Sequence, residues 1–226
     1  MSDRSTERGK LRVSVLASGR GSNLQALLEA CSEEDFPARV VFVASDVPDA
    51  PALERARRFG VEAVHFDPEA PDYEGRLAEA LEERRSGLIC LAGYMRVLGP
   101  AFVRRFGGRV LNIHPALLPS FRGLRAQAKA LRAGVKVAGC TVHLVDEGVD
   151  TGPIVLQAAV PVLEDDTEES LSARILVQEH RIYPLAVRYF AEGRLEVAGR
   201  RVRLRGAGAP GGEVILSPLL GSFRGA

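Results

Sequence analysis

The segment LRVSVLASGRGSNLQALLEAC at residues 11–31 decides the fold. Its first seven residues form a mostly apolar run that predicts a buried strand, and the next four, Ser18-Gly-Arg-Gly21, predict a tight turn. The apolar residues that follow have the i, i+3, i+4, i+7 spacing of one helix face: Leu24, Leu27, Leu28 and Cys31. A strand, a glycine turn and a helix in this order indicate the first unit of an α/β fold.

The alternation of strand and helix continues along the chain. We predict strands at 39–45, 61–66, 88–92 and 110–113, and helices at 52–59, at 73–85 and from Pro100. A helix near 124–132 precedes two adjacent strands, 137–145 and 154–162, whose eight-residue connection predicts an antiparallel hairpin. Thr167 is expected to cap a long helix that ends near Phe190 and bends at Pro184. The predicted fold is α/β: a Rossmann-like parallel sheet with helices on both faces, extended by an antiparallel hairpin.

Composition supports one domain, at residues 11–198. The chain has 226 residues, of which 46% are hydrophobic and 26% charged, as in an average globular protein. A formal charge of +1 gives no global field that would attract nucleic acid or a membrane surface. Residues 1–10 are expected to form a polar extension, and residues 199–226 a loosely held tail rich in glycine and arginine. An RNA-contacting arm is the alternative for this tail; a solvated terminus is the preferred interpretation.

Three widely spaced cysteines, without a C-x-x-C pair, predict reduced thiols in the cytoplasm: Cys31, Cys90 and Cys140. The N-terminus is polar, so we expect no signal peptide. The sequence contains no run of about 18 apolar residues, so we expect no membrane span. The chain also lacks a Walker motif and the common zinc, calcium and serine-hydrolase motifs, so we expect no metal. The oligomeric state, monomer or homodimer, is left open.

The glycine turn allows two interpretations. The free N–H groups at a helix start favour an anion such as one phosphate, which would lie against Gly21, Ser22 and Asn23. Alternatively, Ser22 and Gln25 form an S-x-x-Q capping box, a local feature that any helix can use. The residues alone favour neither interpretation.

The stretch Asn112-Ile-His-Pro-Ala-Leu-Leu-Pro119 is the stronger signal for chemistry. Asn112 and His114 are two residues apart at the end of a buried strand, so their side chains point to one face. An amide and an imidazole there can polarise a carbonyl and hold the negative charge that develops on its oxygen. A single strand histidine is usually structural, but the neighbouring asparagine and the two prolines favour a functional role.

Asp150 lies in a glycine-bracketed loop, where a polar hairpin turn is the simplest interpretation. Placed near His114, its carboxylate would raise the imidazole pKa and favour the protonated ring. His143 is expected to have a structural or supporting role. Residues 91–98 are interpreted either as an apolar wall for a flat heterocycle or as core packing, and Glu179 on the last helix as part of an exposed polar face.

Four stretches, at 18–25, 91–96, 112–123 and 146–153, together resemble the folate-dependent formyltransferase family, and within it the phosphoribosylglycinamide formyltransferases. The resemblance spans about Arg12 to Val197. It implies transfer of a formyl group from 10-formyltetrahydrofolate to the amine of 5-phosphoribosylglycinamide in purine biosynthesis. Small molecules would then be the only partners.

The resemblance also implies roles for individual residues. Asn112, His114 and Asp150 would be catalytic, and Gly21, Ser22 and Asn23 would hold the substrate phosphate. Glu179 would contact the glycinamide or ribose end of the substrate. The folate pocket would be lined by Met95, Arg96, Val97, Leu98, Asp146, Glu147, Gly148 and Val149. The sequence departs from the family pattern at Ala70, Ala116 and Gln127, in place of arginine, serine and histidine.

Alternative functions come from the same family and from other classes. Methionyl-tRNA formyltransferase would add a basic C-terminal domain, and formyltetrahydrofolate hydrolase a preceding regulatory domain; neither is expected from these chain ends. A nucleotide-binding module without catalysis would leave Asn112, His114 and Asp150 without a role. A dehydrogenase would require a further fingerprint glycine, and Asp46 is interpreted as a strand-end cap.

Overall fold

The structure is a computed structural model that describes residues 9–206. Its strands are β1 (Leu11–Leu16), β2 (Ala38–Ser45), β3 (Glu62–His65), β4 (Leu88–Leu91), β5 (Val110–His114), β6 (Val137–Leu144), β7 (Ile154–Pro161), β8 (Leu195–Ala198) and β9 (Arg201–Leu204). Its helices are α1 (Ser22–Ser32), α2 (Pro51–Arg58), α3 (Tyr73–Glu83), α4 (Pro100–Arg105), α5 (Ala126–Arg132) and α6 (Glu168–Ala191).

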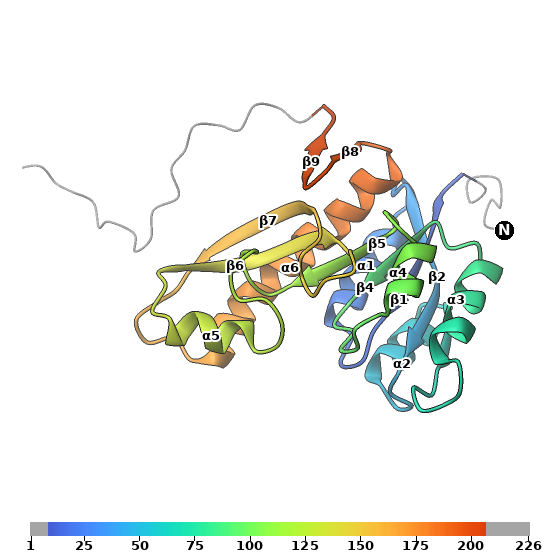
Figure 1. Ribbon diagram of the computed structural model, residues 1–226, viewed down its shortest axis with the longest axis horizontal. Helices are drawn as coiled ribbons and strands as arrows, with labels where there is room; N and C mark the ends of the chain where they lie inside the picture. Colours follow the sequence, from blue (N-terminus) through green and yellow to red (C-terminus); the bar gives the residue numbers. More distant parts are fainter. Residues whose placement is uncertain (1–8, 207–226) are drawn as a thin grey trace, which may run out of the picture.

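These strands form one sheet in the order β3-β2-β1-β4-β5-β6-β7-β9-β8. The five strands from β3 to β5 pair in parallel, and β6 and β7 continue the sheet in antiparallel pairing (Figure 1). The predicted fold class is therefore confirmed. The strand order reverses direction between β1 and β4, and such a switch point leaves a crevice at the carboxyl ends of the strands.

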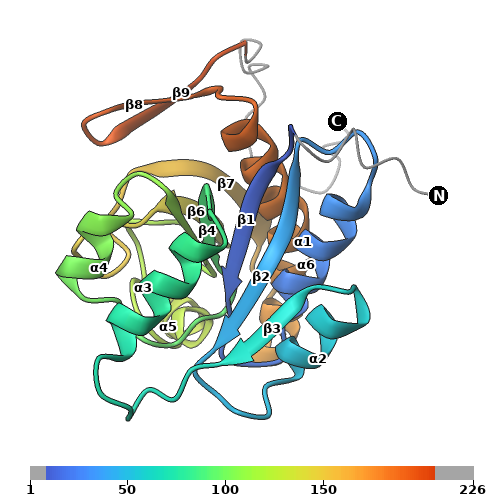
Figure 2. The ribbon, with the colours of Figure 1, turned by 90° about the vertical axis from the view of Figure 1, so that its right-hand side faces the viewer.

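Helices cover both faces of the parallel half. Figure 2 shows α1, α2 and α6 on one face and α3 and α4 on the other. The alternation of side chains along β1 serves both layers: Val13 and Val15 belong to one apolar cluster, and Leu16 belongs to the other. All three are fully buried. Burial on both faces explains why the parallel strands read as nearly continuous apolar runs.

Helix α6 is capped at its start and is hydrogen-bonded to two strands of the parallel sheet. Thr167 caps it as predicted: Thr167 Oγ1 accepts from the Ser170 N–H at 3.2 Å, and the Thr167 N–H donates to Ser170 Oγ at 3.0 Å. Further along, the buried Tyr183 hydroxyl lies 3.0 Å from the carbonyl oxygens of both Leu91 and Leu111. These two hydrogen bonds tie α6 to the end of β4 and to the start of β5. The helix continues through Pro184 to Ala191.

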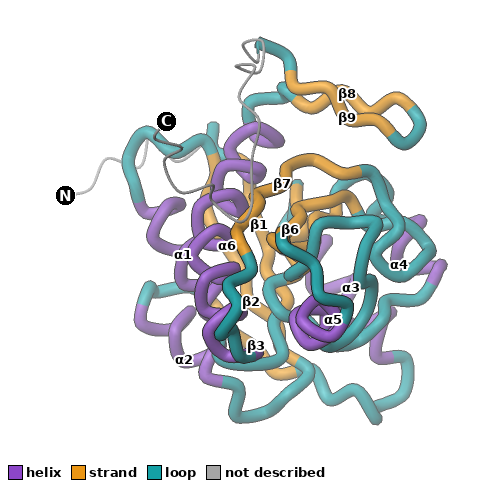
Figure 3. Tube along the Cα trace, turned by 90° about the vertical axis from the view of Figure 1, so that its left-hand side faces the viewer, coloured by secondary structure: helices purple, strands orange, loops and turns teal. Residues whose placement is uncertain are grey.

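Two expectations about local structure are wrong. The expected tail contains β9, which pairs with β8 in an antiparallel hairpin that projects from the main body and joins its sheet at β7 (Figure 3). The glycine-rich composition there supplies the turn, because Gly199 has a φ of 58°. Residues 1–8 and 207–226 of the two predicted terminal segments lie outside the described residues. The second wrong expectation concerns the end of β2. The side chain that caps this end is not that of Asp46 but that of Ser45, whose Oγ accepts the Val47 N–H at 3.0 Å.

Within residues 9–206, no helix is both long enough and apolar enough to cross a membrane.

Candidate active site

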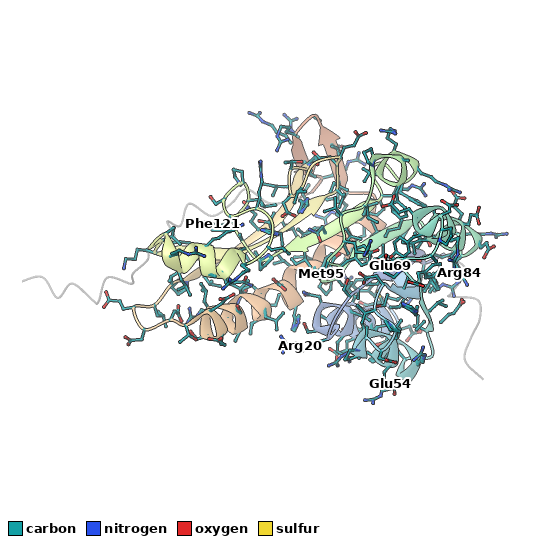
Figure 4. The ribbon with its side chains drawn as sticks, turned by 60° about the horizontal axis from the view of Figure 1, so that its bottom comes forward. Arg20, Glu54, Glu69, Arg84, Met95 and Phe121 are labelled. Atoms are coloured by element: carbon teal, nitrogen blue, oxygen red, sulfur yellow. The ribbon has the colours of Figure 1, made fainter. Side chains whose placement is uncertain are left out.

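A cavity of about 970 Å³ lies at the carboxyl ends of β1, β4 and β5. Its lining comes from the ends of β4 and β5, the loops after β1, β4 and β5, the end of β6 with the β6–β7 loop, the starts of α1 and α5, and the first half of α6. Figure 4 labels Arg20, Met95 and Phe121, which belong to the loops after β1, β4 and β5. The position is the one where open α/β sheets bind ligands.

Asn112, His114 and Asp150 meet in this cavity, although the loop of Asp150 is distant in sequence. Asp150 Oδ2 lies 3.2 Å from His114 Nδ1, and its Oδ1 lies 3.4 Å from Asn112 Nδ2. The Gly123 N–H donates to Asp150 Oδ2 at 2.8 Å and fixes the carboxylate. The three residues singled out from the sequence therefore form one hydrogen-bonded group on the cavity wall.

His143 is a fourth member of this group. It pairs with Asn112 in the register of β5 and β6, so both side chains lie on one face of the sheet. Its Nδ1 donates to the Leu144 carbonyl at 2.9 Å, while its Nε2 lies 3.1 Å from Asn112 Nδ2 and 3.5 Å from Asp150 Oδ1. The expected supporting role fits this position, because His143 orients the Asn112 amide. Its contact with that amide depends on strand register, which the sequence alone does not fix.

The protonation of His114 differs from the expectation. Burial lowers its pKa below the usual 6.5, and this effect exceeds the opposing influence of the Phe121 carbonyl and the Asp150 carboxylate. Nε2 lies 3.0 Å from the Phe121 carbonyl oxygen, so both ring nitrogens face acceptors. The contacts to His143 and the Gly123 N–H hold the pKa of Asp150 at about 2, against the effect of burial. The site therefore pairs a carboxylate whose pKa is lowered with an imidazole whose pKa is also lowered, which favours the neutral ring.

The glycine turn has no capping box, contrary to one of its two interpretations. Gly21, at φ 73°, is the N-cap of α1, and Ser22 is already the first residue of the helix. The Gln25 side chain donates to Glu29 Oε1 at 2.8 Å instead of reaching back to the turn. A Cβ on Gly21 would lie 2.9 Å from Ala52 of α2, so only glycine fits. The first N–H groups of α1 thus have no side-chain cap, an arrangement suited to an anion.

Asn23 and Glu179 form a buried pair at the same end of the cavity. Asn23 Nδ2 donates to Glu179 Oε2 at 2.7 Å, and both side chains are more than nine-tenths buried. Burial raises the pKa of Glu179, and the bond from Asn23 opposes this shift. Asn23 Oδ1 is buried and has no hydrogen-bond partner within the described part of the chain. The expectation that Glu179 belongs to an exposed face is wrong, because α1 packs against α6 and covers this residue.

The opposite end of the cavity is more apolar and more open. Met95 and Val97 are 62% and 71% exposed, and they lie on the loop after β4 with Arg96 and Leu98. The Met95 N–H donates to Ser18 Oγ at 2.9 Å, which joins this loop to the glycine turn. The β6–β7 loop faces it with residues 146–149. Every site residue selected from the sequence lines the cavity except Gly21, whose part is to shape the turn.

Comparison with known proteins shows the family to which the chain belongs. Residues 11–187 match the model of the formyl transferase family. The phosphoribosylglycinamide formyltransferase of Escherichia coli strain K12 is 42% identical over 206 residues, which cover 88% of this chain and 96% of the relative. The chain belongs to the formyl transferase family. A solved structure, glycinamide ribonucleotide transformylase 1 from Symbiobacterium toebii, superposes on it with a TM-score of 0.84 at 57% identity, covering 87% of this chain and 95% of that one.

Some relatives of this formyl transferase are much longer. The trifunctional purine biosynthetic protein adenosine-3 of Drosophila melanogaster is 50% identical over 188 residues, or 80% of this chain. The matched part is 14% of that protein, so the chain spans about a seventh of its length.

The three departures from the family pattern lie at different distances from this formyl transferase site. Gln127, at the start of α5, lines the cavity. Ala116 is buried beside the site, and its N–H donates to the His114 carbonyl at 2.9 Å. Ala70, in the loop before α3, is not among the cavity-lining residues. Of the three side chains, only Gln127 is therefore in a position to contact a ligand directly. Within residues 9–206, no group of His, Cys, Asp or Glu side chains is arranged to hold a metal ion.

Proposed function

We propose that this formyl transferase transfers the formyl group of 10-formyltetrahydrofolate to the amine of 5-phosphoribosylglycinamide. The observation that carries the proposal is the meeting of Asn112, His114 and Asp150 on the wall of one cavity. One end of this cavity has the uncapped start of α1, which suits the phosphate of the ribonucleotide, and the other end is more apolar and more open, which suits the flat heterocycle of the folate. Similarity to phosphoribosylglycinamide formyltransferases over most of the chain supports the same assignment.

The ribonucleotide phosphate binds at the start of α1 in this proposal. The uncapped N–H groups of Ser22 and Asn23, with the helix dipole behind them, favour a dianion. Arg20 lines the cavity at the same turn and adds a positive charge. Arg55 of α2 holds this turn in place, because its Nε donates to the Arg20 carbonyl at 2.8 Å. Glu179 then faces the ribose or glycinamide part of the substrate.

The folate binds at the open end. The loop of Met95–Leu98 supplies apolar side chains and backbone polar groups for a flat heterocycle, and residues 146–149 form the other wall. A cavity of about 970 Å³ has room for a folate head and a ribonucleotide together. The formyl carbon would lie between the two ends, beside the three catalytic candidates.

The first chemical task is to make the amine a nucleophile. An α-amino group has a pKa of about 8, so at neutral pH it arrives mostly as ammonium and must lose a proton. The lowered pKa of His114 leaves the ring neutral and able to accept this proton, directly or through Asp150. The accepted proton would then lie between His114 Nδ1 and Asp150 Oδ2, which are 3.2 Å apart, and would satisfy both atoms. The imidazole thereby becomes positively charged when the substrate becomes reactive.

The second task is to stabilise the tetrahedral intermediate. The amine nitrogen attacks the formyl carbon, and the carbonyl electrons move to oxygen, which becomes negative. The imidazolium charge and the Asn112 Nδ2–H stabilise that oxygen. The 3.4 Å contact from Asn112 to Asp150 is the weaker of its two contacts, so it is the one exchanged for the substrate oxygen. Collapse breaks the bond from carbon to N10, and N10 takes a proton that the attacking nitrogen has lost.

A turnover assay tests the proposal. Purified protein is mixed with 10-formyltetrahydrofolate, with and without the ribonucleotide, and the loss of formylfolate is followed by absorbance. Transfer predicts consumption only when the ribonucleotide is present, in a ratio of one to one. Consumption without the ribonucleotide would indicate a hydrolase, and binding of a nucleotide without any turnover would indicate a binding module. Either result would refute the proposed transfer.

We further propose that one domain, residues 11–198 extended by β9, performs the reaction. Its partners are then two small molecules, without nucleic acid. Cys31, Cys90 and Cys140 are free and buried, which supports a reducing compartment such as the cytoplasm.

A further inference from the structure

The β8–β9 hairpin contacts the main body close to the active-site loop. Ile154 of β7 pairs with Arg201 of β9, and this is the single residue pair of the β7–β9 ladder. Next to it, Arg200 Nη2 donates to the Thr151 carbonyl oxygen at 2.8 Å. Thr151 directly follows Asp150, so a guanidinium from the far end of the chain holds the backbone beside the catalytic carboxylate.

A second cavity lies behind this loop. It has a volume of about 250 Å³, and its lining includes Arg200, Arg122 and Asp150. Among residues 9–206, Asp150 is the one that lines both this cavity and the substrate cavity. The loop therefore separates the two cavities at Asp150, and the space behind it is not filled by apolar side chains. Contacts such as that from Arg200 have to hold its shape.

The loop also needs support because of its backbone. Asp150 has a φ of 52°, a left-handed conformation that residues other than glycine rarely adopt. The start of the loop is tied internally, since Asp146 Oδ1 accepts from the Gly148 N–H at 3.1 Å and from the Thr151 hydroxyl. Its end is tied at Pro153, whose carbonyl oxygen accepts the Leu144 N–H at 2.9 Å. The Thr151 carbonyl lies between these two ties, and Arg200 is its hydrogen-bond partner.

We propose that Arg200 is a positioning residue for the formyl transfer reaction. By holding the Thr151 carbonyl, it keeps the Asp150 carboxylate within reach of His114 Nδ1 and the Gly123 N–H. Its role depends on the proposed function, because it acts on the reaction only through Asp150. It does not contact either substrate, since it lies outside the substrate cavity.

Kinetics of three variants test this role. Arg200→Ala removes the hydrogen bond, Arg200→Lys keeps a cationic donor, and Arg203→Ala removes an exposed arginine from the same hairpin as the control. We expect Arg200→Ala to lower kcat about fivefold, the effect of one ordinary hydrogen bond, with both KM values within about twofold. Arg200→Lys should regain most of the activity, and Arg203→Ala should retain all of it.

A titration of His114 by NMR separates positioning from general stability. His114 faces Asp150, which raises its pKa, and His143 and Lys129, which lower it. When Arg200→Ala loosens the loop, the contribution of Asp150 weakens and the pKa of His114 falls further. A variant that is merely less stable would keep the wild-type pKa in its folded fraction. Arg200→Met, which keeps much of the side chain but has no donor, is the second variant if the alanine variant does not fold.

Two results would overturn the proposal: an unchanged kcat and His114 pKa in the variants without a donor, Arg200→Ala and Arg200→Met, or a change confined to KM. The proposed function fails separately, because then the wild-type protein itself shows no transfer. The His114 titration still reports on the contact between Arg200 and the loop in that case.

Discussion

Replacing Asp150 with asparagine removes the negative charge of the site and keeps its shape. Asparagine tolerates the left-handed backbone of this position, where φ is 52°. The Gly123 N–H can still donate to an amide oxygen, so the loop should stay in place. What is lost is the carboxylate 3.2 Å from His114 Nδ1, which balances the positive ring during the reaction.

The expected loss follows from that distance. Two unit charges 3.2 Å apart attract by about 5 kcal/mol at an effective dielectric constant of about 20. The cost of keeping a carboxylate away from water offsets part of this attraction. A net loss of about 3 kcal/mol remains, or a hundredfold to a thousandfold in kcat.

Steady-state kinetics of formyl transfer measure this loss. Asp72→Asn is the matched control, because Asp72 has the same φ of 52° and precedes α3, outside the lining of both cavities. We expect Asp150→Asn to lose kcat with little change in KM, and Asp72→Asn to retain kcat. A folded Asp150→Asn variant with turnover within about fivefold of the wild type would refute the assigned role of the carboxylate.

Three further results are expected. The His114 ring should titrate below pH 6.5, and kcat/KM should fall as the pH drops through that range. The contribution of His114 to the free energy of unfolding should decrease over the same range, because the folded state binds the proton less readily than the unfolded chain. An NMR midpoint above 6.5 would contradict the dominance of burial. Arg20→Ala should raise KM for the ribonucleotide about tenfold or more and leave KM for the folate unchanged. The phosphate-free riboside should not distinguish Arg20→Ala from wild type, and an equal penalty with both substrates would place Arg20 away from the phosphate. Thr167→Ala should lower the free energy of unfolding by about 1 kcal/mol in a denaturant titration, and Thr167→Ser should restore it; equal midpoints for all three would rule out the cap.

The sequence was sufficient for the parallel half of the fold. Leu24, Leu27 and Leu28 have a helical spacing, and the apolar strands beside them are buried on both faces, so local pattern and tertiary packing agree. The hairpin of β8 and β9 was missed because its composition is that of a solvated tail. Its strands are short and largely exposed, so they carry little apolar alternation.

Parts of the site depend on contacts that no local pattern contains. Asn112 and His114 were found because they share one strand, whereas Asn23 and Glu179 are 156 positions apart and meet only when α1 packs on α6. The sign of the His114 pKa shift was missed for a related reason. The expected effect of Asp150 is present, but the degree of burial, which exceeds it, is a property of the whole fold.

A double-variant comparison tests most directly whether His114 and Asp150 act as one unit on the formyl group. The kcat values of His114→Ala, Asp150→Asn and the double variant are measured under the same conditions, with folding verified by circular dichroism. If the pair shares one proton and one charge, the double variant should be no more than about tenfold slower than the slower single variant. Losses that multiply in full would show that the two side chains act independently and would contradict the mechanism.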